Sequence, residues 1–239
     1  MQSIFRRYEM KYLISEKQRV ILMEALSKYM LPDQYGAYLV QNLYFDTERW
    51  DVIRTSIEKP AYKEKLRLRC YGEAAIDSSY YLELKKKYKG IVYKRRIELP
   101  ARSLANRSVR ELVAQSPAQI AKELGFYLHT NDVSEKIFIS YQRAAFAGVD
   151  DPELRVTFDT DIRFRLNDLK FAKSGADRII LPDDKVLMEI KMLGGMPMWM
   201  AGVLSDNDVF PTNFSKYGVC YTDYIFQNLA GDGKEQICA

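Results

Sequence analysis

The stretch Lys63-Glu64-Lys65-Leu66-Arg67-Leu68-Arg69-Cys70-Tyr71 alternates charged and apolar side chains. Successive side chains of a β-strand point to opposite faces of a sheet, so this period of two indicates a strand. Lys65, Arg67 and Arg69 then share one face, and the apolar residues between them share the other. The stretch therefore predicts a sheet with one cationic face and one buried face.

Further segments on both sides extend this pattern into an α+β chain. Strands are predicted at 5–14, 38–45, 80–88, 91–99, 135–146, 153–161 and 185–192, and helices at 16–29, 48–56, 102–115, 117–126, 197–204 and 215–229. Ser15 and Gln18 form a capping-box pattern at the start of the first helix. Hairpin-length connections, such as the one through Lys89-Gly90, favour an antiparallel sheet over a doubly wound one. We expect one domain over residues 1–230 and a flexible tail at 231–239, because no long Pro-, Gly- or Ser-rich linker divides the chain.

Composition excludes several classes of protein. The chain has 239 residues, of which 47% are hydrophobic, so it can bury a sizeable core and is not disordered overall. The formal net charge of +4 says little about partners. Three widely spaced cysteines form neither a disulfide framework nor a zinc motif, and a reducing compartment fits them best. With no signal peptide or long apolar stretch in view, we expect a cytoplasmic chain without a membrane span.

The charged face recurs on nearly every predicted strand. Each strand alone is compatible with an ordinary solvated face. Taken together, however, Arg and Lys recur with only single carboxylates among them, and a sheet that curled shut would place these cations inside. Many like charges in a confined space repel one another, so the arrangement requires a bound polyanion. Phosphate fits this role, because its oxygens accept paired hydrogen bonds from an Arg guanidinium and also attract the Lys ammonium group. The interspersed carboxylates fit Mg²⁺, which binds one or two carboxylates together with phosphate oxygens.

These segments, in this order, resemble a known family. The resemblance is carried by Glu9-Met10-Lys11, Arg67-Leu68-Arg69, Glu83-Leu84-Lys85, Tyr141-Gln142-Arg143-Ala144-Ala145-Phe146, Arg155 before Phe158-Asp159-Thr160-Asp161, Glu189-Ile190-Lys191 and Phe214-Ser215-Lys216-Tyr217-Gly218. The chain resembles the VTC (vacuolar transporter chaperone) polyphosphate polymerase domain, one of the CYTH-like triphosphate tunnel metalloenzymes, over about residues 5–225. The resemblance implies a closed eight-stranded antiparallel barrel, flanked by helices, that forms a tunnel for phosphate chains.

The resemblance also implies roles for individual residues. It implies that the catalytic residues, which bind the triphosphate, are Arg67, Arg69, Lys85, Arg143, Arg155 and Lys216. It implies further phosphate ligands at Lys11, Lys94, Arg96, Lys191 and Ser215. The metal ligands that it implies are Glu189, Glu9 and Glu83. Simpler family members carry E-x-E-x-K at the first strand, where this chain has Arg7 at the earlier carboxylate position, which suits the polymerase branch better. The membrane and regulatory segments of eukaryotic relatives are absent, so no membrane-coupled export is expected.

The predicted reaction transfers the γ-phosphoryl group of ATP to a growing inorganic polyphosphate chain, releases ADP and uses Mg²⁺ or Mn²⁺. Such a transfer requires positioning and charge neutralisation rather than a protein nucleophile. The alternatives are a tripolyphosphatase or nucleoside triphosphatase with water as acceptor, and a non-catalytic binder of polyphosphate or nucleotide. Nucleic-acid binding is disfavoured because the cations lie on many separate strands.

Some residues keep a second interpretation. Glu9 and Glu83 either bind metal or pair with neighbouring cations, and Asp159 has the same two interpretations. Ser215 is either part of an anion site or a plain helix cap. His129 is expected in an exposed turn, Arg95 on the opposite face from Lys94 and Arg96, and Tyr141 in wall packing. The Met- and Trp-rich segment 192–200 is a packed helix face or an adenine platform.

Overall fold

The computed structural model describes residues 8–89, 91–172, 174–175 and 177–227. The strands are β1 (Tyr8–Ser15), β2 (Met30–Asp46), β3 (Tyr62–Tyr71), β4 (Ser79–Tyr88), β5 (Ile91–Pro100), β6 (Ser134–Gly148), β7 (Arg155–Arg165), β8 (Arg178–Ile179) and β9 (Lys185–Met192). The helices are α1 (Glu16–Leu26), α2 (Asp51–Ile57), α3 (Ala101–Leu104), α4 (Val109–Gln115), α5 (Gln119–Thr130), α6 (Met198–Asp206), α7 (Lys216–Cys220) and the π-helical turn η1 (Tyr221–Ile225).

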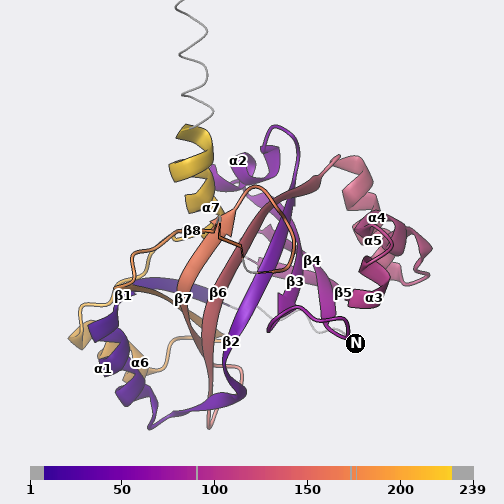
Figure 1. Ribbon diagram of the computed structural model, residues 1–239. Helices are drawn as coiled ribbons and strands as arrows, with labels where there is room; N and C mark the ends of the chain where they lie inside the picture. The colour runs from indigo at the N-terminus through magenta and orange to yellow at the C-terminus, as the bar shows by residue number, and fades with distance from the viewer. Residues whose placement is uncertain (1–7, 90, 173, 176, 228–239) are drawn as a thin grey trace, which may run out of the picture.

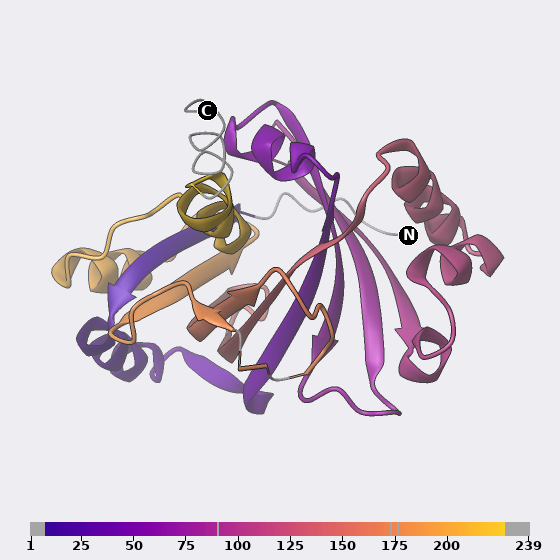
Figure 2. The same ribbon diagram turned by 45° about the horizontal axis from the view of Figure 1, so that its top comes forward.

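The strands form one antiparallel sheet, which confirms the predicted α+β class. Its order is β1-β9-β7-β6-β2-β3-β4-β5, with the short β8 paired to β7. Helices lie around this strongly curved sheet (Figures 1 and 2). Most predicted strands recur within a few residues of the expected positions because alternation along each strand is a local signal. β2 is the exception, since it begins at Met30 rather than at residue 38, and the short β8 was not predicted.

The predicted closed barrel is not confirmed. Within the described residues, no backbone pairing joins the edge strands β1 and β5. The sheet nevertheless curls far enough for Lys85 of β4 to donate a hydrogen bond to Glu9 of β1 at 3.0 Å. Side chains therefore bridge the seam, and lysines on both sides of it disfavour closer approach by mutual repulsion.

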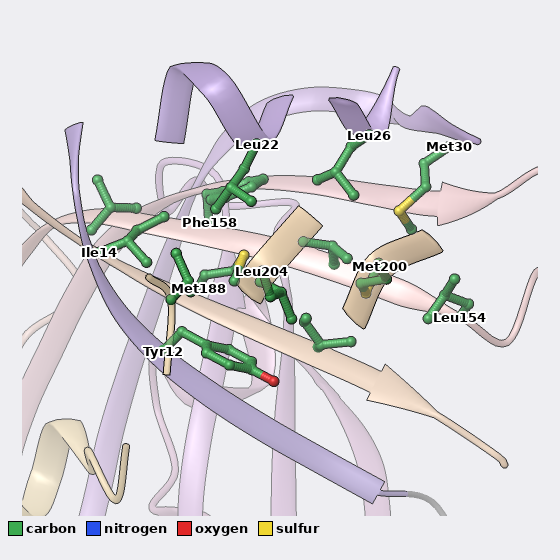
Figure 3. Close-up of a cluster of buried hydrophobic side chains, with 14 of the residues drawn as sticks. Tyr12, Ile14, Leu22, Leu26, Met30, Leu154, Phe158, Met188, Met200 and Leu204 are labelled. Atoms are coloured by element: carbon green, nitrogen blue, oxygen red, sulfur yellow. The ribbon is translucent and has the colours of Figure 1, made fainter. Parts of the chain in front are cut away.

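Alternation along the strands buries the convex face of the sheet under helices. Met188 and Phe158 of the sheet pack against Leu22 of α1 and Leu204 of α6 (Figure 3). A second core places α4 and α5 over the convex side of β3 and β4. Because the apolar side chains are used in these cores, the charged side chains of the same strands are left on the concave face.

The last helical segment lies on the other side of the sheet. A third core lies at one end of the concave face. It contains Tyr217 and Cys220 of α7 and Tyr221 of η1, packed against Val40 of β2 and against apolar side chains of β6, β7 and β9. This packing brings the beginning of α7 directly onto the charged surface.

The helices depart from prediction mainly in their length. The Ser15 capping box is present, with Gln18 N–H donating to Ser15 Oγ at 3.2 Å. The helix expected at 102–115 is divided into α3 and α4, because Ser108 forms a second capping box that begins a new helix. Asp46 accepts hydrogen bonds from the backbone of Val52 and Ile53 and so holds α2 against the end of β2.

Candidate functional site: a cationic concave face

Glu83 organises one group of cations on the concave face. Its carboxylate is 1% exposed and accepts hydrogen bonds from Arg67 Nε at 3.0 Å and Arg67 Nη2 at 2.8 Å. Lys94 forms an ion pair with the other carboxylate oxygen, and Arg69 and Arg96 lie at 4.0 and 3.9 Å. Burial alone raises the pKa of Glu83, but Arg67, Arg69 and Lys94 lower it to about 2. This carboxylate is therefore an ionised anchor for arginines.

Asp159 organises the second group. Arg143 donates to its two carboxylate oxygens at 2.6 and 2.7 Å, and Lys216 of α7 also donates to it. Burial opposes ionisation of Asp159, whereas the charges of Lys216 and Arg143 lower its pKa. Because Asp159 is 0% exposed, its bidentate contact fixes the Arg143 guanidinium in one orientation.

Glu189 lies beside this group under different constraints. Lys216, Lys11, Lys191 and Arg143 surround its carboxylate at 3.6–3.8 Å, which is ion-pair distance. Burial raises the pKa of Glu189, and these cations lower it well below its usual range. Glu189 is therefore ionised but held less tightly than Asp159.

Tyr141 joins the two groups. Its hydroxyl accepts a hydrogen bond from Arg69 Nη2 at 3.2 Å, and its ring centroid lies 4.4 Å from Lys216 Nζ and 5.1 Å from Arg143 Cζ. Burial raises the pKa of Tyr141, but Arg143, Arg69 and Lys216 outweigh it and lower the pKa overall. Tyr141 was predicted only to pack in the wall, and nothing in its local sequence indicates this contact between distant strands.

A cavity of about 810 Å³ opens at the seam between β1 and the β3–β4 hairpin. It is also bordered by the ends of α2 and α7. Its lining contains seven lysines and two glutamates: Lys11, Lys59, Lys63, Lys65, Lys85, Lys87, Lys89, Glu9 and Glu64. We call it the lysine cavity. Burial and the nearby charges of Lys11, Lys63 and Lys85 lower the pKa of Lys65 to about 7.

The structure brings most of the predicted site residues together. Around Glu83 lie Arg67, Arg69, Lys94 and Arg96. Around Asp159 and the adjacent Glu189 lie Arg143, Lys216, Lys11 and Lys191. Glu9 and Lys85 form a separate ion pair at the edge of the lysine cavity. Burial raises the pKa of Glu9, but Lys85, Lys191 and Lys11 lower it to about 2.

Two predicted site residues stand apart from these groups. Arg155 is exposed at the beginning of β7, where it is paired in register with Lys191. Ser215 caps α7, its Oγ accepting a hydrogen bond from Gly218 N–H at 3.2 Å, and it also lines the lysine cavity. For Glu83 and Asp159, the structure shows the pairing with cations. Arg7 and the tail at 231–239 lie outside the described residues.

Other expectations concerned residues outside the site. Arg95 faces away and contacts Glu123 of α5 at 2.9 Å, and His129 is exposed in the last turn of α5 rather than in a turn after it. Met200 is buried in the core of Figure 3, and Trp199 packs against that core on the convex side. The packed-helix-face interpretation is therefore confirmed for Met200 and Trp199, and Met192 of β9 packs in the same core, whereas Met198 is exposed.

The carboxylates of the concave face fit a metal ion only in combination with phosphate oxygens. Within the described part of the chain, no group of three or more His, Cys, Asp or Glu side chains could hold a metal. Glu189 is ionised and free of short hydrogen-bonded contacts to its four cations. Thr157, paired with it in register, has a buried hydroxyl without a hydrogen-bond partner among the described residues. One or two carboxylates plus phosphate oxygens are a usual Mg²⁺ donor set.

The fold and face together define an α+β protein with a curled antiparallel sheet and a cationic concave surface. The chain belongs to the VTC domain family, whose model matches residues 6–224. This membership associates the chain with a polyphosphate- or nucleotide-related function. No curated protein is significantly similar to it.

Three solved structures are similar at low sequence identity. A candidate adenylate cyclase from Vibrio parahaemolyticus matches at 10% identity and a TM-score of 0.49, covering 92% of this chain and 100% of that one. A protein of Pyrococcus horikoshii OT3 matches at 11% identity and 0.47, with coverages of 90% and 99%. A chain in the Mediator head module of Schizosaccharomyces pombe matches at 12% identity and 0.45, with coverages of 84% and 90%.

The described helices are all too short or too polar to cross a lipid bilayer.

Proposed function

We propose that the chain is a polyphosphate polymerase that transfers the γ-phosphoryl group of ATP to the end of an inorganic polyphosphate chain. The supporting observation is that Arg69, Arg143 and Lys216 converge around Tyr141 on the concave face of a member of the VTC family. Arg67 lies on the same face and donates a hydrogen bond to the Tyr44 hydroxyl at 3.2 Å. Cations from separate strands and from α7 can contact several phosphates of one chain at once and from different sides.

The carboxylates prepare the arginines for this role. Glu83 and Asp159 hold the Arg67 and Arg143 guanidinium groups in fixed orientations through short hydrogen bonds. Donors that are oriented before the substrate arrives need little reorganisation as charge develops on the phosphoryl oxygens. In this proposal, Arg67, Arg69 and Arg143 hold the triphosphate, with Lys85, Lys94, Arg96 and Arg155 as the peripheral ligands.

The reaction itself requires no protein nucleophile. A terminal oxygen of the polyphosphate chain attacks the γ-phosphorus, the bond to the β-phosphate oxygen breaks, and ADP leaves. Lys216 and Arg143 neutralise charge on the transferred group, while Lys11 and Lys191 hold the neighbouring phosphates. Glu189, with Glu9 as a second carboxylate, would hold a Mg²⁺ or Mn²⁺ ion, which would neutralise negative charge on the phosphates.

The lysine cavity suits the growing chain. Lysines are point charges without the directional fork of arginine, so they attract successive phosphates without fixing each one. Lys63, Lys65 and Lys87 were not among the predicted site residues, because charged residues near strand ends most often lie in solvent.

One experiment separates the possible activities. The purified chain is incubated with ATP and either Mg²⁺ or Mn²⁺, and polyphosphate, ADP and orthophosphate are resolved together. We expect polyphosphate and ADP, with each phosphate lost from ATP recovered in the polymer. Orthophosphate without polymer would instead identify a hydrolase, and tripolyphosphate binding without turnover would identify a binding module. Either outcome would contradict the proposal.

A further inference from the structure

A row of four tyrosines lies at the end of the concave face away from the lysine cavity. Tyr35 and Tyr38 come from the first half of β2, Tyr71 from the end of β3 and Tyr81 from the beginning of β4. Ring centroids in successive pairs are 6.1, 6.1 and 5.9 Å apart, with interplanar angles of 77°, 63° and 61°. These are edge-to-face contacts, so no two of these rings cover each other face to face.

The row is open to solvent although it is an aromatic surface. Tyr35 is 69% exposed and Tyr71 is 37% exposed, and Tyr38 and Tyr81 are half-buried. Tyr217 of α7, in contrast, is buried in a core. The tyrosine row therefore presents aromatic surface to solvent, although Arg96 covers one face of the Tyr81 ring.

Arginines of the site border the row directly. Arg69 donates to the Tyr71 hydroxyl at 3.3 Å, and Arg96 Cζ lies 3.5 Å from the Tyr81 ring centroid. Tyr38 is paired in register with Arg143. A ligand that combines a flat ring with phosphates could therefore contact both surfaces at once.

We propose that the tyrosine row binds the base of the nucleotide substrate. This inference rests on the proposed function and adds an orientation to it. Along one face of β3 the order is Lys63, Lys65, Arg67, Arg69 and Tyr71. Alternate residues of a strand are spaced by about 6.6 Å, so Tyr71 and Lys65 are separated by roughly 20 Å. The base then lies at Tyr71, the triphosphate crosses the two arginines, and the polymer extends toward the lysine cavity.

The test compares ATP with inorganic tripolyphosphate, which has the phosphates but no base. In Tyr71→Leu, which keeps apolar bulk but lacks the ring, we expect ATP to bind about 10-fold more weakly, because base stacking on one aromatic side chain contributes an effect of this order. Tripolyphosphate affinity should change less than about twofold. Tyr71→Phe keeps the ring and should bind ATP nearly as the original chain does.

Tyr62→Leu is the matched control. Tyr62 and Tyr88 form another exposed edge-to-face pair on the same hairpin, with centroids 6.4 Å apart, but they alternate with the concave residues and so belong to the opposite face. Isothermal titration of the three variants and the original chain with both ligands gives the comparison.

The outcomes separate this inference from the proposed function. Loss of ATP affinity alone in Tyr71→Leu supports the base site. Equal weakening of both ligands, or no change in either, overturns the base site while the phosphate site stands. If the original chain binds neither ligand, the proposed function fails and the base site fails with it. If Tyr71→Leu does not fold, the same comparison in Tyr38→Leu decides.

Discussion

The arginine region, which comprises Arg67, Arg69 and Arg143 with the buried carboxylates Glu83 and Asp159, differs from the lysine cavity in how its cations are held. Arg67 and Arg143 each make two hydrogen bonds to a buried carboxylate. The lining of the lysine cavity contains seven lysines and two glutamates, and Lys65 there has its pKa lowered to about 7. Both regions have more cations than carboxylates, but the arginines are fixed by hydrogen bonds to buried carboxylates, whereas most of the cavity lysines are not.

This difference indicates that the two regions bind phosphate in different ways. Paired guanidinium groups can hold a reacting phosphate in one geometry, because their forks match its oxygens and their positions are already fixed. Unpaired ammonium groups retain a polyanion at many positions along it. Four substitutions test whether the two regions differ in this way.

The largest effect is expected for Glu83→Gln, which removes the buried negative charge that pairs with Arg67, Arg69 and Lys94. These three cations would then lack their carboxylate partner, so the free energy of unfolding should fall by about 3–5 kcal/mol. Glu123→Gln, at a partly exposed pair with Arg95, should cost less than about 1 kcal/mol. Urea unfolding of both variants at neutral pH gives the comparison.

The pH dependence of Glu83→Gln has a defined sign. The pKa of Glu83 is lowered to about 2 in the folded chain from 4.5, so its stabilisation is fully present above pH 4.5 and is lost between pH 4.5 and 2. The original chain should lose stability more steeply than Glu83→Gln across this interval. Parallel stability curves would show that the pairing of Glu83 contributes nothing.

The second effect is on catalysis. Arg143→Ala should reduce the rate of polyphosphate formation by about 100-fold or more, comparable to losing one oxyanion donor. Arg95→Ala, on the convex face, should leave the rate unchanged. The rates are measured with chains whose melting temperature confirms folding. Near-normal turnover in Arg143→Ala would remove this residue from the site.

A third substitution should change stability and binding in opposite directions. Burial and like charges disfavour the charged form of Lys65, so Lys65→Met should raise the free energy of unfolding by about 1–2 kcal/mol at pH 6, allowing for partial exposure. This gain should shrink as pH rises from 7 toward 10.5, because the folded chain releases the Lys65 proton first. Tripolyphosphate should bind about 3–10-fold more weakly to Lys65→Met at pH 6. A variant that is both less stable and unaffected in binding would contradict this account.

The smallest effect is expected at the exposed rim of the lysine cavity. Lys87→Ala should weaken tripolyphosphate binding about twofold at low salt, and the difference should vanish at high salt because exposed charges are screened. Lys28, which is exposed just after α1 and does not line the lysine cavity, is the control, and Lys28→Ala should show no change at either salt concentration. A large loss of tripolyphosphate affinity in Lys87→Ala that did not depend on salt would show that Lys87 holds phosphate as the arginine region does, and would contradict this prediction.

The cationic face was predictable because it follows from alternation within single strands. Lys65, Arg67 and Arg69 share a face for purely local reasons, and the observed β3 confirms it. Pairing of Asp159 with cations was one of its two interpretations, but the particular partners of Asp159 and Tyr141 were not predictable, since they come from β3, β6 and α7. The tyrosine row was missed for the same reason: Tyr38, Tyr71 and Tyr81 lie far apart in sequence and meet only through strand pairing.

The sequence by itself determined the strands, their antiparallel hairpins and the side of each strand that carries charge, because these depend on the period of polar and apolar residues and on turn residues. Tertiary structure alone decided how far the sheet curls, that its edges are bridged by Glu9 and Lys85 rather than by backbone, and which cations are paired with carboxylates. The physical reason is that pairing and curvature depend on contacts between residues distant in the chain, which no local pattern specifies.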